Sequence, residues 1–148
     1  MTREEILIAA GHILPTLPAP GGNYLSAKTV GSLVYLAGVI SSDEEGVITG
    51  PVSDLESGYI AAQRCALTQL AVLKQHLGSL DTIKSIVSVN GYVAAAAGFP
   101  DSPKIINGAS DLLVAVFGEA GRHVRAAIGV SSLPRKALVE LQMIVEIE

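Results

Sequence analysis

The residues best suited to chemistry in this chain are Arg125 and Glu140. They lie in two runs with a period of two, residues 124–130 and 139–147, which a Ser-Ser-Leu-Pro turn joins, and this pattern predicts a β-hairpin. The apolar faces of paired strands must coincide, so if residues 131–134 form a four-residue loop, Arg125 faces Glu140. Directly opposed side chains are about 4.5–5.5 Å apart at Cβ. With small residues beside Arg125, a cation, a carboxylate and open space would form a candidate site.

A second interpretation of this pattern is a cross-strand ion pair on a solvated face of the sheet. Such a pair contributes only about 0–1 kcal/mol to stability and needs no function. Two other polar residues allow similar alternatives. Asn90 interrupts an apolar strand, so its side chain either bonds to nearby backbone or faces a pocket. Tyr24 follows a Pro/Gly-rich loop, where it either packs as a lid or contacts a ligand.

The composition of the chain limits its classes of function. With 148 residues, of which 49% are hydrophobic, we expect one domain over 1–148 with a single core. No apolar run is long enough to cross a bilayer and the chain starts with charged residues, so we expect a cytoplasmic protein without a membrane partner. The net charge of −4, with no basic stripe, argues against nucleic acid. A small domain this apolar is expected to have a subunit interface.

The sequence contains no motif for a metal or a cofactor. Cys65 is the single cysteine, which excludes an internal disulfide and a thiolate metal cluster. His12, His76 and His123 belong to separate predicted elements and lack ligand spacing. There is no phosphate-binding loop and no GxSxG elbow. We therefore expect neither a metal nor a bound cofactor.

The order of predicted elements indicates an α+β fold. Residues 1–20 are expected to form a short helix, capped by Thr2 and Glu5, and a Pro-rich extension. The other elements each have their own periodicity or capping signal: a strand pair at 24–38, a long helix between Asp54 and Gly78, a strand at 83–97, a helix at 109–117 capped by Asn107, and the hairpin. Together they predict a mixed sheet with helices packed on one face.

Several stretches resemble one known family over nearly the whole chain. They are GNYLSA at 22–27, LVYLAGVI at 33–40, AAQRCALTQLAVL at 61–73, NGASDLL at 107–113, and R-x-x-x-G-V-x-x-L-P with the following V-E-L at 125–141. The last of these is the most specific. On these residues the chain resembles the RidA family, also called YjgF-like proteins and historically labelled endoribonuclease L-PSP or translation initiation inhibitors. The starting helix, the GNY loop and GRHVR resemble the longer branch of that family.

The resemblance implies a fold similar to the small trimeric type of chorismate mutase, assembled as a homotrimer with clefts between subunits. It also implies an activity, the hydrolysis of reactive imines and enamines such as 2-aminoacrylate to 2-keto acids and ammonia. Family members need no metal or bound cofactor for this reaction. The implied partner is a small imine or enamine that bears a carboxylate.

The resemblance also implies roles for particular residues. Arg125 matches the arginine that holds the substrate carboxylate, which suits a planar guanidinium. Glu140 matches the glutamate that positions or activates the attacking water, a general acid–base task. Tyr24 matches a tyrosine that helps to wall the cleft. Gly38 lies where the family strand offers backbone groups to the ligand.

Asn90 and Asn107 match less specific positions of the cleft, and two stretches depart from the family pattern. Many members have S-G-Q-x-P where this chain has Ala37 to Ser41, so a glutamine and a proline are absent. His123 stands where the common pattern has proline. Two other functions therefore stay open: a non-catalytic trimer that binds small carboxylates, and an RNA-cleaving or translation-inhibiting protein, against which the acidic net charge counts.

Overall fold

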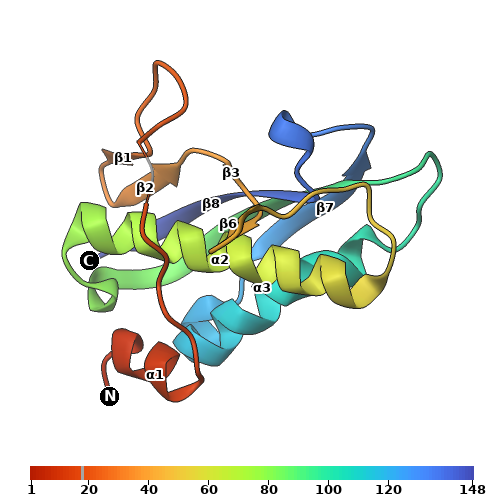
Figure 1. The fold of residues 1–148 in the computed structure, drawn as a ribbon. Coiled ribbons are helices and arrows are strands. Elements are labelled where there is room, and N and C mark those ends of the chain that lie inside the picture. Colours follow the sequence, from red (N-terminus) through yellow and green to blue (C-terminus); the bar gives the residue numbers. More distant parts are fainter. Residues whose placement is uncertain (18) are drawn as a thin grey trace.

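The main sheet has six strands, and its two long helices lie against one face of it (Figure 1). The computed structural model describes residues 1–17 and 19–148, so Pro18, within the predicted Pro-rich extension, lies outside the described residues. The strands of this sheet are β1 (Ala27–Val30), β2 (Leu33–Leu36), β3 (Val39–Ile40), β6 (Ile83–Ala94), β7 (Val124–Val130) and β8 (Val139–Ile147). The helices against it are α2 (Leu55–Leu77) and α3 (Ser102–Phe117). The predicted α+β fold is confirmed.

The strand order β1-β2-β8-β6-β7 places β6 between β7 and β8. β7 runs parallel to β6, whereas β8 runs antiparallel to it. The predicted hairpin is therefore wrong: both of its strands form, but each pairs with β6 and not with the other. The connection from β7 to β8 crosses the end of β6, where Ala94 N donates to Leu138 O at 2.9 Å. The β6-α3-β7 passage is the crossover that a parallel pair of strands requires.

The faces of β7 are also the reverse of the sequence prediction. The residue of β6 paired with Arg125 is Val89, which is fully buried beneath the helices. Paired residues point to the same side of a sheet, so Arg125 lies on the helix face. Val124 and Ile128, predicted to share the apolar face of β8, are 71% and 49% exposed on the other side. The parity argument failed because it assumed that the two strands pair directly.

The two long helices begin and end at identifiable residues. Asp54 Oδ1 accepts from Ser57 N at 2.8 Å at the start of α2, and Gly78 ends the helix with a φ of 88°, as predicted. α3 already begins at Ser102, with a proline in its first turn, so Asn107 lies inside the helix and the prediction that it caps α3 is wrong. The helices approach closely at Gly108, where a Cβ would collide with the carbonyl oxygen of Tyr59.

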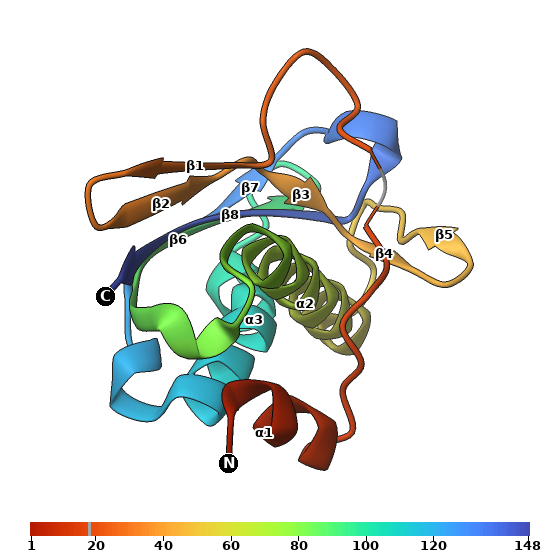
Figure 2. The ribbon, with the colours of Figure 1, turned by 90° about the vertical axis from the view of Figure 1, so that its left-hand side faces the viewer.

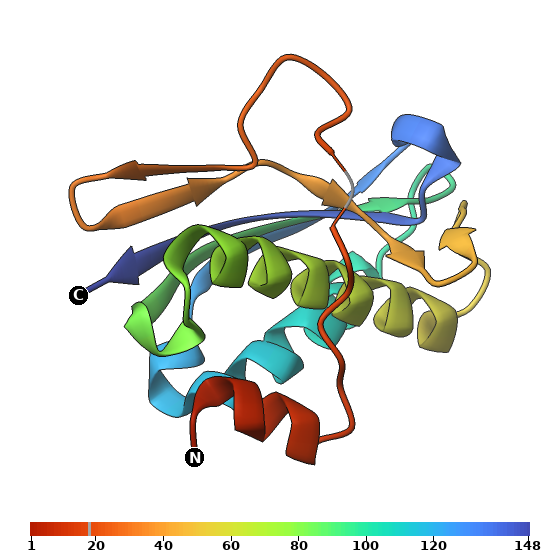
Figure 3. The ribbon, with the colours of Figure 1, turned by 60° about the vertical axis from the view of Figure 1, so that its left-hand side comes forward.

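The N-terminal helix α1 (Arg3–Ala9) packs beside α3, on the side away from the sheet (Figure 2). Thr2 Oγ1 accepts a hydrogen bond from Glu5 N at 3.1 Å, which confirms the predicted helix and its cap. Beyond α1 the chain crosses α2 on its way to the sheet (Figure 3). Leu14 and Leu17 of this segment pack against the core and so attach it to the domain.

Short elements complete the fold around the main sheet. β4 (Ser42–Asp43) and β5 (Gly46–Val47) pair as a separate two-stranded sheet. Three 3-10 turns follow the longer elements: η1 (Leu80–Thr82), η2 (Gly118–Gly121) and η3 (Pro134–Lys136). Of these, η2 and the residues after it lead directly into β7 and therefore into the region of Arg125.

A buried glutamine of α2 completes the sheet where β2 gives way to β3. Both strands pair with β8, but residues 37–38 between them do not. Gln69 is fully buried at this gap. Its Nε2 donates to Ala37 O at 2.9 Å, and its Oε1 accepts from Met143 N at 3.0 Å. The side-chain amide thus replaces missing strand-to-strand hydrogen bonds and holds the chain in place beside Gly38.

Candidate functional site

Arg125 lies on the edge strand β7, and its side chain extends over α3. Nη1 donates to Ser110 Oγ at 3.0 Å, and Nη2 donates to the Pro103 carbonyl oxygen at 3.2 Å. The helix therefore orients the guanidinium, while the residue stays exposed. A guanidinium carries more N–H groups than these two contacts use, so it can still bind an anion through two hydrogen bonds.

The guanidinium forms part of the wall of a cavity of about 260 Å³ between α3 and the start of β7. The other polar residues that line this cavity are Asn107, Ser110, Asp111, Arg122 and His123. The first three come from one face of α3, because helical residues three and four apart are neighbours. The topology of β6-α3-β7 therefore gathers polar groups from a helix and an edge strand at one place.

The charged groups of this cavity differ in their partners. Tyr59 OH donates to Asp111 Oδ2 at 2.7 Å, and this bond, with burial, raises the pKa of Tyr59. Arg122 Nε donates to Glu119 Oε1 at 2.9 Å. Arg125, by contrast, contacts only neutral acceptors among the described residues. Its uncompensated positive charge makes the cavity suited to an anion.

His123 begins a short hydrogen-bonded chain that ends at Arg125. Its Nδ1 lies 2.7 Å from Gly121 O, and its Nε2 lies 2.9 Å from Ser110 Oγ. A carbonyl oxygen only accepts, so we assign the ring proton to Nδ1, and Nε2 then accepts the Ser110 hydroxyl hydrogen. Burial lowers the pKa of His123, the bond to Gly121 opposes this, and the charge of Arg125 lowers it further. The imidazole is therefore neutral at pH 7.

Glu140 lies on the other face of the sheet. Its ladder partners are Tyr92 of β6 and Ile40 of β3. Its carboxylate packs against Gly38, where a Cβ would come within 2.7 Å of Oε2, so a larger residue there would displace the carboxylate. Burial raises the pKa of Glu140. A carboxyl group with a raised pKa exchanges its proton closer to neutral pH, which suits general acid–base chemistry.

Within one chain Arg125 and Glu140 are not in contact, so this prediction is wrong. Arg125 pairs with Val89, and Glu140 pairs with Tyr92, three residues further along the intervening strand β6. With strands about 4.8 Å apart and a rise of about 3.3 Å per residue, the two Cα atoms are about 14 Å apart. The side chains also point to opposite faces of the sheet, so no change of rotamer brings them together.

The other sequence-predicted residues divide between the two faces. Asn107 lines the cavity of Arg125, whereas Gly38 contacts Glu140. Asn90 is paired with Gln142, beside Glu140 on the face away from the helices. Tyr24 is 51% exposed, and its hydroxyl accepts from Gly21 N at 3.3 Å. The loop at 19–26, which carries it, rises from the same side of the sheet as Glu140 (Figure 2).

Sequence reasoning did not identify Ser110, Asp111 and Arg122, and it gave His123 no role. One signal was available: the polar residues at 107, 110 and 111 share a face of an otherwise apolar helix. Cys65 is a core residue. Its thiol is fully buried, and burial raises its pKa, so it stays protonated and unreactive.

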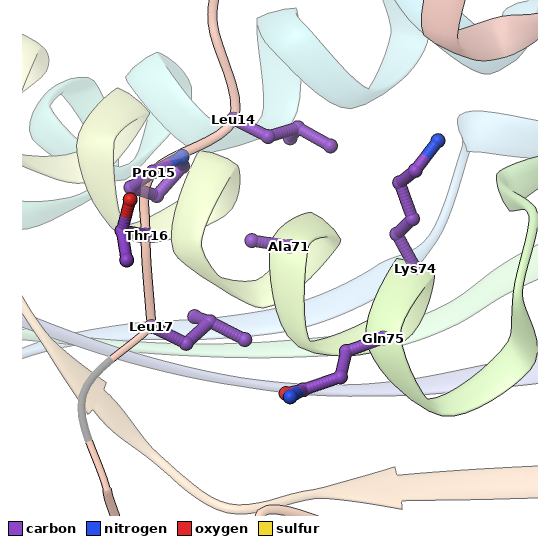
Figure 4. A pocket seen from close by; sticks show the side chains of 7 residues that line it. All are labelled: Leu14, Pro15, Thr16, Leu17, Ala71, Lys74 and Gln75. Carbon is purple, nitrogen blue, oxygen red and sulfur yellow. The ribbon is translucent and has the colours of Figure 1, made fainter.

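A second cavity, of about 370 Å³, lies between residues 14–17 and α2 (Figure 4). Leucine side chains and Ala71 form much of its wall, and its charged group, Lys74, is paired with Glu4 at 3.1 Å. We assign it no chemistry, because it lacks an unpaired charge or an acid–base group.

In the part of the chain that the structure describes, no three His, Cys, Asp or Glu residues are grouped to hold a metal ion. None of the described helices has the length and apolar character needed to cross a membrane.

Comparison with known proteins places this arrangement in a family. Residues 4–147 match the family model described as "YjgF/chorismate mutase-like, putative endoribonuclease". The chain belongs to the YjgF/chorismate mutase-like family. The predicted RidA/YjgF resemblance and the chorismate mutase-like fold are thereby confirmed.

Two relatives and one solved structure show which proteins this YjgF-family chain is similar to. "Protein TCP17" of Trypanosoma cruzi is 37% identical over 139 residues, which cover 90% of this chain and 87% of the relative. A 2-iminobutanoate/2-iminopropanoate deaminase of Dermatophagoides farinae is 32% identical over 136 residues, 90% of this chain and 93% of the relative. The crystal structure of a protein of unknown function from Agrobacterium tumefaciens, 38% identical, matches with a TM-score of 0.91 over 99% of this chain and 94% of that one.

Proposed function

We propose that this YjgF-family chain hydrolyses reactive imines and enamines of the 2-aminoacrylate type to 2-keto acids and ammonia. The observation that carries the proposal is the uncompensated guanidinium of Arg125 in the wall of a small cavity. These substrates bear a carboxylate next to the reacting carbon, which such a guanidinium can bind. The similarity to a relative named as an imine deaminase supports the same chemistry. The proposed setting is the cytoplasm, with neither a nucleic acid nor a membrane as partner.

In this proposal two residues share the chemical work. Arg125 binds the substrate carboxylate through two hydrogen bonds and so fixes the position of the C=N carbon. Glu140 takes a proton from the attacking water and returns it to the nitrogen. An enamine first tautomerises to the imine, as a proton moves from its nitrogen to its terminal carbon. Addition of water to the C=N bond then gives a carbinolamine, whose C–N bond breaks to release ammonia and the keto acid. One water is consumed, and no other reactant is needed.

Arg125 and Glu140 point to opposite faces of one sheet, so this mechanism requires two copies of the chain. We propose a homotrimer in which Arg125 of one copy and Glu140 of the next face a common cleft. Exposed apolar side chains support an interface on the sheet face away from the helices, where Tyr35, Val124 and Ile128 are 44%, 71% and 49% exposed. An apolar surface of this kind is typical of a subunit contact.

The first test measures the release of ammonia and keto acid from imines that an amino-acid oxidase generates in situ. The wild-type protein should accelerate this release. Arg125→Ala should lower kcat/KM by roughly 150-fold or more, since it removes two hydrogen bonds and hydrogen bonds to charged groups contribute about 1.5–3 kcal/mol each. Lys104→Ala is the matched control, because Lys104 is an exposed cation on α3 that pairs only with Asp101 among the described residues.

The second test asks whether the site is shared between copies. Arg125→Ala and Glu140→Gln should each be inactive alone. When the two are co-expressed, a site is active only where the Glu140→Gln copy supplies Arg125 and the Arg125→Ala copy supplies Glu140. Random mixing in a symmetric assembly should therefore restore on the order of a quarter of the sites. A mixture that stays inactive would refute the shared site. If the wild-type protein accelerates no imine but binds small carboxylates by calorimetry, the non-catalytic binding protein is the better description.

A further inference from the structure

The cavity of Arg125 contains a serine–histidine pair that takes no chemical step in the proposed imine hydrolysis, in which Ser110 only helps to orient Arg125. Ser110 Oγ and His123 Nε2 are 2.9 Å apart, and His123 Nδ1 lies 2.7 Å from Gly121 O. The carbonyl oxygen fixes the tautomer, so the lone pair of Nε2 is directed at the Ser110 hydroxyl. A hydroxyl nucleophile, a base within hydrogen-bond reach and an acceptor that orients the base are the three parts of a nucleophilic serine site.

The surroundings of this pair suit nucleophilic chemistry. Ser110 is half-buried and lines the cavity, so its hydroxyl can be reached by a small molecule. Arg125 Nη1 donates to the same oxygen at 3.0 Å, and it can stabilise negative charge that develops there or on an adjacent oxyanion. Burial lowers the pKa of His123, so the imidazole remains a neutral base at pH 7.

A second hydroxyl–histidine contact in the molecule shows what distinguishes this pair. Thr29 Oγ1 lies 2.8 Å from His76 Nε2. That contact is exposed, and among the described residues the other ring nitrogen of His76 has no acceptor that would orient the imidazole. Neither residue lines the cavity of Arg125. The Thr29–His76 contact therefore serves as an internal control: a hydroxyl lies next to an imidazole there, but in the described part of the chain no acceptor orients the imidazole, and the hydroxyl lies outside the cavity of Arg125.

We propose that Ser110 and His123 are the nucleophile and the general base of an acyl-transfer site that hydrolyses small esters. In the first step Ser110 Oγ attacks the ester carbonyl and its proton passes to His123 Nε2. The bond from the carbonyl carbon to the alcohol oxygen then breaks, and the alcohol leaves with that proton. Water, deprotonated by His123, attacks the acyl-serine and releases the acid, which restores the Ser110 hydroxyl. Water is the only co-reactant.

The cavity also defines the substrate class. Its volume of about 260 Å³ has room for a small acyl group. The N–H groups of Arg125 that do not contact α3 lie beside Ser110 and favour an acyl group with a carboxylate. The site therefore takes short hemiesters of dicarboxylic acids. This inference does not rest on the proposed imine hydrolysis, since neither Glu140 nor a second copy of the chain takes part.

The experiment uses diisopropyl fluorophosphate, which phosphorylates activated serines as its P–F bond breaks and fluoride leaves. The full-length chain is treated with it, and the modified residue is identified by peptide mass spectrometry. We expect one phosphoryl group, on Ser110, and no label on Thr29. His123→Asn should slow labelling by about 100-fold or more, because its amide can still donate to Gly121 O but offers no base. His76→Asn is the matched control and should be labelled at the wild-type rate.

A substrate assay gives the second readout. Mono-p-nitrophenyl succinate should be hydrolysed faster than p-nitrophenyl butyrate, and Arg125→Lys should reduce this preference. The rate should fall as His123 is protonated, with its inflection below the ordinary pKa of 6.5. The charged groups that share the cavity with His123 are Arg122, Arg125 and Asp111.

Two outcomes overturn the proposal. One is a folded protein, by circular dichroism, in which Ser110 stays unlabelled. The other is labelling of His123→Asn at the wild-type rate. Either result would reduce Ser110 and His123 to residues that position Arg125. Labelling without imine hydrolysis would sustain this inference while refuting the proposed deaminase, and imine hydrolysis without labelling would do the opposite.

Discussion

Replacing Gln69 by leucine tests how the region around Gly38 is built. The leucine fills nearly the same volume but removes both hydrogen bonds of the amide, to Ala37 O and from Met143 N. The Met143 N–H is buried, and a buried donor left without a partner costs about 1–3 kcal/mol. Ala37 is half-buried, so water can replace part of its lost bond, and we add about 0.5–1 kcal/mol for it. We expect Gln69→Leu to lose about 1.5–4 kcal/mol, a large part of a typical stability of about 5–15 kcal/mol.

Urea unfolding at one fixed protein concentration, followed by circular dichroism, measures this loss. Gln142→Leu is the matched control, because Gln142 Nε2 also donates to a strand carbonyl, Leu36 O at 3.1 Å, but the residue is exposed. Water can replace that bond, so we expect a loss of less than about 1 kcal/mol. Equal losses in the two variants would refute the reasoning, and so would a Gln69→Leu protein within about 0.5 kcal/mol of wild type.

Three other predictions concern packing and ionisation. Gly108→Ala should lower the free energy of unfolding, measured with urea, by about 3 kcal/mol or more, because the new Cβ collides with the Tyr59 backbone. Gly78→Ala is strained only by its φ of 88° and should lose about 1 kcal/mol. Equal losses would contradict this account of the helix crossing. Glu140→Gln should be more stable than wild type at about pH 8, since burial raises the pKa of Glu140 and ionisation therefore opposes folding as the pH rises. This advantage should vanish below the ordinary pKa of 4.5, and an advantage that persisted there would have another cause. The lowered pKa of His123 predicts that wild type loses stability relative to His123→Asn as the pH falls below 6.5, and parallel stability curves for the two proteins would exclude this effect.

Local signals in the sequence predicted the elements and much of the fold. Thr2, Asp54 and Gly78 mark helix ends by capping chemistry that depends on nearby residues alone. The alternation of β8 identified its buried face for the same reason. The start of α3 was predicted too late, because Asn107 is a plausible cap, whereas the proline in the first turn of the helix was the better signal.

The pairing of β7 could not be obtained in this way. A period of two shows that a segment is a strand, but it does not identify the neighbour of that strand. The strand β6 lies far earlier in the chain, and only the crossover through α3 returns β7 to its side. Arg125 and Glu140 were therefore identified correctly as polar residues on strands. They were predicted on the same face of the sheet, but they lie on opposite faces. Their predicted roles rested on the family resemblance, and the arrangement of helices and strands does not test those roles.

The position of β8 has a consequence for how the molecule is made. β8 pairs with β2, β3 and β6, all of which precede it in the chain. On the ribosome, the β1–β2 hairpin and the β6-α3-β7 unit therefore emerge as two half-sheets with open edges, which only β8 can join. The cavity of Arg125 belongs to the second half and can form during that interval. Glu140 arrives on the joining strand itself, so the carboxylate takes its place beside Gly38 only in the step that closes the sheet.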